Sequence, residues 1–403
     1  MKNLKQIAKA YALKNAIAHD GKCQQGAVLS GLFAEGLKRE DVKKYIRDVN
    51  EIVKEVNKLS LEEQKILFEK HSNEISEREV KEGLEELPNV PKTGVITRFG
   101  PNPSGPLHIG HAISNVISSL YVRKYGGKFY VRIEDTNPEK VVKECYKTFK
   151  QDCDWLFGNV AGYIIQSDRN EIYYKYAEKL IKSGDAYVCI CPAEKFRGII
   201  SGKKECPCRK KSVKENLEDW KKMLDKKGFK PGEAVLRFKS NINHPNPALR
   251  DFPLARINLT PHPRQKKKYR VWPMMFLAVA VDDIEYGMTH IIRGKEHRDN
   301  AERQKLIYAA LGLEKKFPWT FFMGRIKFTD LNLGKRFIQA AVKEGKYSGW
   351  DDERLPTLAS LRKRGYKPEA FWKLAEQRGL TEVDKVMKSK DFFDLLDGFN
   401  KEA

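Results

Sequence analysis

Hydrophobic positions recur at helical spacing through the first part of this chain of 403 residues. Glycine and proline are nearly absent from residues 37–82, where charged side chains are dense. Such a pattern is typical of amphipathic helices on a solvated surface. The prolines within residues 87–92 then interrupt it. We therefore predict a helical N-terminal domain over residues 1–90.

The pattern then changes to alternating strand and helix signals. Runs rich in β-branched and aromatic residues predict strands at 95–99, 129–133 and 289–293. Helical periodicity predicts helices at 108–125, 138–157 and 299–311. Strands that alternate with helices through short connections are typical of a parallel, doubly wound sheet. We predict an α/β domain made of two halves, 91–185 and 269–330.

The stretch between these halves has a different character. Residues 186–268 are rich in cysteine, lysine and proline. We interpret them as an insertion that splits the α/β domain. From residue 331 to residue 403 the pattern is helical again, and the segment is strongly basic. We predict a helical C-terminal region there.

The charge balance gives the first indication of function. Lysine and arginine number 76 and aspartate and glutamate 54, which leaves a formal net charge of +22. Such an excess of positive charge usually indicates a polyanionic binding partner, and a nucleic acid is expected before a membrane surface. A generally basic or heat-adapted surface is the alternative, and composition does not choose among these explanations.

Nothing in the chain is typical of an exported or membrane-spanning protein. The first 20 residues are polar and lack the apolar core of a signal peptide. The longest apolar run, Met274 to Val281, is well short of the roughly 20 residues that a spanning helix needs. We expect a cytoplasmic protein without a membrane partner.

Four of the seven cysteines form two close pairs, and this spacing predicts a metal site. Each pair is Cys-x-Cys, and a loop separates the two pairs, which suits a closed tetrahedral zinc site. Free thiols are the alternative, because a reducing compartment disfavours disulfides. With all four positions filled by protein, the zinc would be structural. The predicted ligands are Cys189, Cys191, Cys206 and Cys208.

The sharpest chemical signal is the segment 101–111, Pro-Asn-Pro-Ser-Gly-Pro-Leu-His-Ile-Gly-His. It follows a predicted strand and opens a predicted helix, where backbone N–H groups and the positive helix end favour phosphate. His108 and His111 are three residues apart, so their rings share one face and can hydrogen-bond a triphosphate. Gly110 leaves room for a flat base to approach the backbone. For the histidines alone, exposed helix-start side chains are the alternative.

The segment 97–111 resembles the signature of class I aminoacyl-tRNA synthetases, in the archaeal style of the glutamyl/glutaminyl branch. The resemblance extends along nearly the whole chain and keeps the family's motifs in order. The other matching segments are 132–138, 278–283, 292–297 and 347–358. It implies a Rossmann-like catalytic domain that is split by a zinc-bearing insertion and flanked by helical N- and C-terminal regions.

The resemblance implies an enzyme that uses ATP and Mg²⁺ to activate L-glutamate and transfers it to the 3′ end of tRNA(Glu), with tRNA(Gln) as a second candidate acceptor. It assigns catalysis to His108, His111 and Lys335. The implied ATP-binding residues are Pro103, His108, Gly110, His111, Lys335 and Arg336. The implied glutamate-binding residues are Arg98, Asn102, Glu134, Met275 and Arg293.

The residue types at these positions suit that chemistry. Arg98 and Arg293 can each offer a planar fork to a carboxylate. Glu134 can accept an ammonium group, with Asn102 as a polar neighbour. Lys335 can neutralise the charge of departing pyrophosphate. For any one of the charged residues of the pocket alone, a structural salt bridge within the sheet is the alternative.

Two positions depart from the family's pattern. Gly334 stands where a serine is usual before the catalytic lysine, so one hydroxyl is lost. Met275 stands where archaeal members carry a tyrosine that touches the substrate, and methionine cannot donate an O–H bond. The alternative function is therefore a catalytically impaired or short paralogue that binds tRNA or activates glutamate for a different acceptor.

Basic runs flank the cysteine cluster at residues 203–204, 209–211 and 264–270. Because the insertion should overhang the catalytic site, we predict that these runs bind the tRNA acceptor stem. Members of this branch normally continue into β-barrels that read the anticodon, whereas this chain stops at Ala403. A truncation, a separate anticodon-binding chain and a naturally short form that lacks the barrel stay open.

Overall fold

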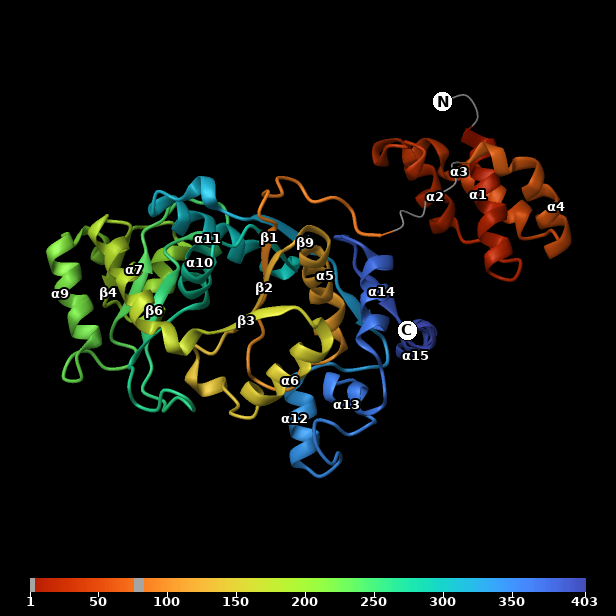
Figure 1. Ribbon diagram of the computed structural model, residues 1–403. Coiled ribbons are helices and arrows are strands. Elements are labelled where there is room, and N and C mark those ends of the chain that lie inside the picture. The colour runs from red at the N-terminus through yellow and green to blue at the C-terminus, as the bar shows by residue number, and fades with distance from the viewer. Residues whose placement is uncertain (1–3, 76–82) are drawn as a thin grey trace. The chain divides into compact units, whose positions relative to one another are not determined.

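The computed structural model describes residues 4–75 and 83–403, apart from the side chains of Arg39 and Arg336 (Figure 1). The chain divides into two compact units, Met1–Lys81 and Glu82–Ala403. Each unit has a hydrophobic core of its own. Within the described ranges, no helix is long and apolar enough to cross a membrane.

The first unit is a small bundle of helices. Its core is formed by apolar helix faces, on which Leu13, Val28 and Val49 are fully buried. Ser60 and Glu63 cap the last of the four α-helices reciprocally, and this cap fixes where the helix begins. The α-helices are α1 (Leu4–Ala18), α2 (Gln25–Ala34), α3 (Val42–Val56) and α4 (Leu61–His71).

Three parallel strands form the centre of the second unit. In spatial order they are β1 (Val95–Phe99), β2 (Gly127–Ile133) and β3 (Val160–Ile165). Helix α5 (Ile109–Tyr125) connects β1 to β2, and α6 (Cys145–Phe157) connects β2 to β3. Gly127 is required where β2 begins, because a Cβ there would lie 2.0 Å from the carbonyl oxygen of Val95.

A second parallel pair, β8 (His290–Gly294) and β9 (Trp319–Met323), lies beside β1. The Thr289 N–H donates to the Ile96 carbonyl over 3.0 Å, and the Ile96 N–H donates to Thr289 Oγ1 over 2.9 Å. The strands therefore continue from β1 on both sides, with β2 on one side and β8 on the other. Doubly wound sheets bind ligands at such a switch point, beside the carboxyl ends of the strands. The predicted α/β class is confirmed.

The middle of the second unit carries a four-stranded antiparallel sheet. It packs with helices around a core that includes Trp220, Leu236 and Leu254. The strands are β4 (Ala186–Cys189), β5 (Val235–Phe238), β6 (Pro253–Ile257) and β7 (Val271–Pro273). The helices of this part are α7 (Asn170–Lys182), α8 (Ala193–Ser201), α9 (Val213–Leu224), α10 (Met275–Glu285) and α11 (Arg298–Ala310).

The C-terminal part of the second unit supports the start of α5. The Ile109 N–H donates to the Pro356 carbonyl and the Leu358 N–H to the Leu107 carbonyl, both over 3.0 Å. Its helices are α12 (Lys335–Lys343), α13 (Leu358–Lys363), α14 (Pro368–Arg378) and α15 (Ser389–Glu402). Its strands, β10 (Ile326–Phe328) and β11 (Lys385–Met387), form a parallel pair. The finer domain boundaries, at residues 90, 185, 268 and 330, stay predictions.

Candidate active site

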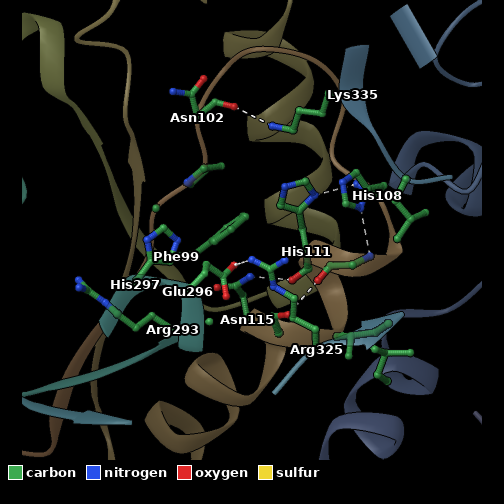
Figure 2. A pocket seen from close by; sticks show the side chains of 18 of the residues that line it. Phe99, Asn102, His108, His111, Asn115, Arg293, Glu296, His297, Arg325 and Lys335 are labelled. Atoms are coloured by element: carbon green, nitrogen blue, oxygen red, sulfur yellow. Dashed lines mark hydrogen bonds and ion pairs between the residues drawn. The ribbon is translucent and has the colours of Figure 1, made fainter. Parts of the chain in front are cut away.

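A cavity of about 1100 Å³ opens at the carboxyl ends of β1, β2 and β8. Figure 2 shows that Phe99 from β1, Arg293 from β8, His108 and His111 at the start of α5, and Lys335 at the start of α12 face this space. Pro103 is buried outside the lining, and the side chain of Arg336 lies outside the described residues. The predicted site residues that line the cavity are Arg98, Asn102, His108, Gly110, His111, Glu134, Met275, Arg293 and Lys335.

His108 and His111 fix each other's orientation at the start of α5. Nδ1 of His108 accepts from the Gly110 N–H over 3.2 Å, and Nδ1 of His111 accepts from the His108 N–H over 3.1 Å. Burial and the Lys335 cation lower the pKa of His108 to about 3, and burial lowers the pKa of His111 well below its usual range. Each ring is therefore neutral and keeps its proton on Nε2. The half-buried pair offers two N–H donors, with ring centroids 4.0 Å apart (Figure 2).

Gly110 allows the close packing of this histidine pair. A Cβ at this position would lie 3.0 Å from the His108 ring and 3.3 Å from Leu333 Cδ1. A side chain would therefore displace either the ring or the loop that precedes α12. The glycine also keeps this part of the wall flat, as the predicted approach of a base requires.

Lys335 reaches the same cavity from the first position of α12. Its Nζ donates to the Asn102 carbonyl over 2.8 Å, and no carboxylate among the described residues pairs with it. Burial lowers the pKa of Lys335 to about 8. A cation at the positive end of a helix is unfavourable, and a bound anion would relieve that cost.

Gly334, which departs from the family's pattern, fits the loop that carries Lys335. The Gly334 N–H donates to Asn332 Oδ1 over 2.8 Å. A Cβ at residue 334 would lie 2.9 Å from the same oxygen. The Gly334 backbone, with a φ of −64°, is one that any residue adopts, so the loop accepts the glycine without strain.

The fork of Arg98 is occupied within the protein. Its Nε donates to Asp283 Oδ1 over 2.8 Å and its Nη2 donates to Asp283 Oδ2 over 3.1 Å. Arg132 donates to the same carboxylate over 2.6 Å. Burial alone would raise the pKa of Asp283, but the two guanidinium groups lower it to about 2. Arg98 therefore faces the cavity only with its remaining N–H groups.

Arg293 has no such partner. It lies near the carboxyl end of β8, where its Nη2 donates to Gln304 Oε1 over 3.1 Å, and it forms no ion pair with any residue of 4–75 or 83–403. Burial and repulsion from Arg98 lower the pKa of Arg293 to about 9. Its guanidinium is half-buried and has no anionic partner among the described residues, which is unfavourable. Arg293 is therefore the cation of this cavity that most favours a carboxylate ligand.

Glu134 also lines the cavity, and only one of its two carboxylate oxygens accepts a hydrogen bond within the described residues. Its Oε1 accepts from Arg132 Nη2 over 2.8 Å, whereas its Oε2 has no hydrogen-bond donor among the described residues. Gly100 makes room for it, since a Cβ there would lie 2.5 Å from Oε1. Glu134 can therefore accept an ammonium group. Met275, the first residue of α10, lines the same space.

Several residues of this site were missed by sequence reasoning. Asp283 lies beside Asp282 in helix α10, directly after the apolar residues Met275–Val281, and two buried carboxylates there signal a need for cationic partners. Beyond the motifs around them, nothing in the sequence indicates that Arg132 and Gly100 belong to the site. An ion pair of 2.7 Å between Arg325 and Glu296 borders the cavity (Figure 2). No pattern in the sequence links these two residues.

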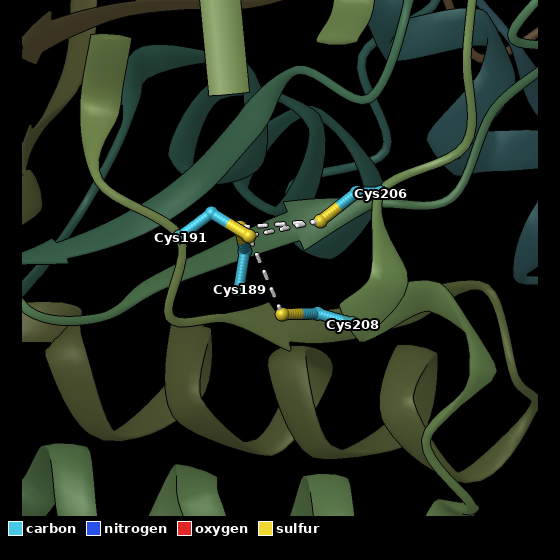
Figure 3. Close-up of side chains that lie close together, drawn as sticks. All are labelled: Cys189, Cys191, Cys206 and Cys208. Carbon is cyan, nitrogen blue, oxygen red and sulfur yellow. Dashed lines mark hydrogen bonds between the residues drawn. The ribbon is translucent and has the colours of Figure 1, made fainter. Parts of the chain in front are cut away.

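The four clustered cysteines come together beside β4 (Figure 3). Their sulfur atoms all lie within 4.8 Å of one another, and the three closest pairs are 3.6, 3.7 and 3.8 Å apart. These distances are too long for disulfides. A tetrahedral zinc ion with Zn–S bonds of about 2.3 Å requires sulfur separations of roughly 3.8 Å, so the donor set fits zinc. The four candidate ligands are the cysteines that the sequence predicts, Cys189, Cys191, Cys206 and Cys208.

The basic runs around this cluster divide into paired and exposed side chains. Arg209 pairs with Asp251, and Lys211 pairs with Asp219 over 2.7 Å. These two residues therefore support the fold of the insertion. The exposed lysines of the three runs are Lys203, Lys204, Lys210, Lys266, Lys267 and Lys268.

Comparisons with known proteins agree with this geometry. Residues 94–397 match the family model of the catalytic domain of class I tRNA synthetases (E and Q). The chain is 46% identical over 374 residues to the glutamate–tRNA ligase of Methanocaldococcus jannaschii, covering 93% of this chain and 66% of that one. It is 44% identical over 398 residues to the glutamate–tRNA ligase of Thermococcus kodakarensis, covering 96% and 69%. The chain thus spans about two thirds of the length of these relatives.

A solved structure resembles the chain in fold. The glutamate–tRNA synthetase of Elizabethkingia anophelis superimposes with a TM-score of 0.53, covering 77% of this chain and 70% of that one. The sequence identity is 21%, so this likeness concerns the fold alone.

Proposed function

Because this chain belongs to the glutamate and glutamine group of class I tRNA synthetases, we propose that it activates L-glutamate with ATP and transfers the glutamyl group to tRNA. The observation that carries the proposal is the half-buried guanidinium of Arg293, which forms no ion pair with the described residues and lies in the cavity that also holds His108, His111 and Lys335. That cavity offers a carboxylate site and a phosphate site side by side. The membership confirms the family resemblance of the sequence.

ATP binds at the start of α5 and α12. The Nε2–H groups of His108 and His111 donate to the phosphates, and Lys335 adds a positive charge that offsets the departing pyrophosphate. Gly110 lets the base approach the wall, and Pro103 and Arg336 complete the proposed set. Mg²⁺ is bound through the phosphates of ATP, as is usual for this ion.

Glutamate binds between Arg293 and Glu134. Arg293 takes the side-chain carboxylate, while Glu134 Oε2 accepts the ammonium group. The remaining N–H groups of Arg98 and the polar Asn102 complete the pocket, and Met275 contributes an apolar wall. Asp283 and Arg132 act by holding Arg98 and Glu134 in place.

The reaction has two steps. An α-carboxylate oxygen of glutamate attacks the α-phosphorus of ATP, an acyl phosphate bond forms, and the bond to pyrophosphate breaks. A terminal ribose hydroxyl of tRNA(Glu), or of tRNA(Gln), then attacks the carbonyl carbon and AMP leaves. Neutral histidines donate hydrogen bonds throughout and need no change of protonation. The exposed lysines of the insertion contact the acceptor stem.

A structural zinc ion belongs to the proposal as well. The four cysteine sulfurs have the separations that zinc requires and leave no ligand position for a substrate. The zinc would hold the loops on either side of α8 together. The relatives extend beyond the part that matches this chain. A separate anticodon-binding chain is one explanation for that difference in length.

The alternative is that the chain is an impaired or short paralogue. Gly334 and Met275, which depart from the family's pattern, are the reason for considering it. Gly334 fits its loop through the bond to Asn332, and the charged residues of the cavity are in place. These observations favour the ligase over the alternative.

The test is a charging assay of the purified chain with total tRNA, ATP and either glutamate or glutamine. We expect glutamate to be attached to tRNA. ATP–pyrophosphate exchange with and without tRNA shows whether activation itself depends on tRNA, as in similar enzymes. A preference for glutamine, or tRNA binding without charging, would count against the proposed function.

A further inference from the structure

The turn at residues 262–268 presents three adjacent lysines and is closed at its base by two backbone hydrogen bonds. The Lys266 N–H donates to the His262 carbonyl and the His262 N–H donates to the Lys266 carbonyl, both over 2.8 Å. Lys266 has a φ of +55°, which a lysine rarely adopts without such support. Lys266 and Lys267 are exposed, and neither side chain has an ion-pair or hydrogen-bond partner in the described part of the chain. The turn therefore presents two unneutralised charges to solvent.

The His262 ring connects this turn to the interior. Its Nδ1 accepts from the N–H groups of Arg264 and Gln265, both over 3.1 Å. Nε2 therefore carries the proton, and it donates to the Asp135 carbonyl over 3.0 Å. The fully buried ring also stacks on Trp272, with centroids 4.9 Å apart and an interplanar angle of 25°.

Both inner contacts of His262 lead to the amino-acid pocket. Asp135 directly follows Glu134, the proposed ammonium ligand. Trp272 lies in β7, which runs into Met275 at the start of α10. Glu134 and Met275 line the cavity, whereas His262 does not. The ring thus contacts residues that lie close in sequence to two residues of the pocket wall.

Other bonds make the same connection rigid. Asp135 accepts from the Ser167 N–H and from the Ser167 hydroxyl, both over 2.7 Å. Arg264 forms a bidentate pair with Asp168, both bonds being 2.7 Å long. A displacement of the turn therefore reaches the residues beside Glu134 by more than one path.

We propose that His262 is a positioning residue that transmits contact between the 262–268 turn and a nucleic-acid backbone to Glu134 and Met275. Phosphates on Lys266 and Lys267 fix the turn, the turn fixes the ring through two N–H groups, and the ring fixes the Asp135 carbonyl and Trp272. The inference rests on the proposed function, because it takes tRNA as the nucleic acid and glutamate as the ligand of the pocket.

The experiment compares the wild type with His262→Gln and with the double variant Lys266→Ala/Lys267→Ala. Lys315→Ala/Lys316→Ala is the matched control, because it removes an equal charge from another exposed lysine pair. Hydrogen exchange of segments 132–139 and 271–276 is measured with and without saturating tRNA. The KM for glutamate is measured by ATP–pyrophosphate exchange in the presence of tRNA.

We expect tRNA to slow hydrogen exchange in both segments of the wild type and of the control. In His262→Gln, tRNA should bind with unchanged affinity, the protection should be lost, and the KM for glutamate should rise about tenfold with a smaller change in kcat. The lysine variant should bind tRNA more weakly and lose the protection even at saturation.

Wild-type behaviour of His262→Gln at saturating tRNA would overturn the inference, as would a wild type in which tRNA protects neither segment. A His262→Gln protein that loses tRNA affinity and kcat alike would indicate a merely structural role and would also overturn it. If that variant does not fold, the lysine variant decides alone. The hydrogen-exchange measurement requires only that tRNA binds. Failure of the proposed function would therefore be recognised separately, by the absence of tRNA charging in the wild type.

Discussion

Lys335 occupies a position that is unfavourable for the ligand-free protein. It begins α12, it is half-buried, and its ammonium group contacts the Asn102 carbonyl and the Phe149 ring but no carboxylate among the described residues. The bound triphosphate supplies the missing negative charge, so Lys335→Ala should lower the rate of glutamate activation by about a hundredfold or more. Lys343→Ala, an exposed change in the same helix, should leave the rate unchanged. Pyrophosphate exchange measures both, and an unaffected Lys335→Ala enzyme would contradict this role.

The protonation of Lys335 predicts a pH dependence. Its pKa is lowered to about 8 by burial, so the cation is present below pH 8 and is lost above it. The kcat/KM for ATP reports the free enzyme and should fall about tenfold per pH unit above that point. His108, with a pKa of about 3, and His111 should cause no fall near pH 6. In Lys335→Arg the alkaline fall should move to higher pH, and an unmoved profile would assign it to another group.

Met275 gives a residue-scale test of the amino-acid pocket. It lines the cavity together with Arg293 and Glu134, but its side chain has no O–H to donate. Met275→Tyr should tighten glutamate binding several-fold, because one hydrogen bond contributes on the order of 1 kcal/mol. Met275→Phe adds a ring without the hydroxyl and is the control. Equal KM values for glutamate in the two variants would exclude a contact by the restored hydroxyl.

At the scale of elements, the cysteine cluster joins the end of β4 to the loop after α8. Metal analysis should find about one zinc per chain, and Cys208→Ser should lose it, since structural sites use all four ligands. Cys23→Ser, in the first unit, should keep the metal. Chelation should speed hydrogen exchange within residues 189–211 and leave β1, β2 and α5 protected. A metal-free protein with a fully protected insertion would refute the zinc site.

The local elements were predictable where the pattern is strong. The strand predicted at 95–99 matches β1, and the helix predicted at 108–125 matches α5 to within one residue, because buried strands with short connections leave a clear periodicity. The adjacency of β1 and β8 was not predictable, since it depends on bonds between Ile96 and Thr289. No local pattern reports a contact across 193 residues.

The same limit applied to the site. The residue types and the motif order placed nine of the predicted residues at one cavity. The sequence did not reveal that Asp283 occupies the fork of Arg98, or that Arg209 and Lys211 are neutralised by Asp251 and Asp219. Ion pairs form between side chains that the fold brings together, so they change which charges stay available to a ligand. Roles that rest on free charge are therefore the part of a sequence prediction that most needs the structure.

At the scale of the whole molecule, the net charge of +22 is divided between structural and available cations. Binding of tRNA should weaken linearly in a plot of log affinity against log salt concentration, because each neutralised phosphate releases counterions. Lys203→Ala/Lys204→Ala, a change of two exposed residues, should reduce the slope by about 1 to 2. Lys211→Ala should instead lower the melting temperature, since it removes the bonds of Lys211 to Asp219 and to the Val188 carbonyl and leaves Asp219 only the more distant Lys222, and it should change the slope less. Filter binding across a salt series measures the slopes, with Lys315→Ala/Lys316→Ala as the control. Equal slopes for the Lys203/Lys204 variant and the control would place the acceptor stem away from the cysteine cluster.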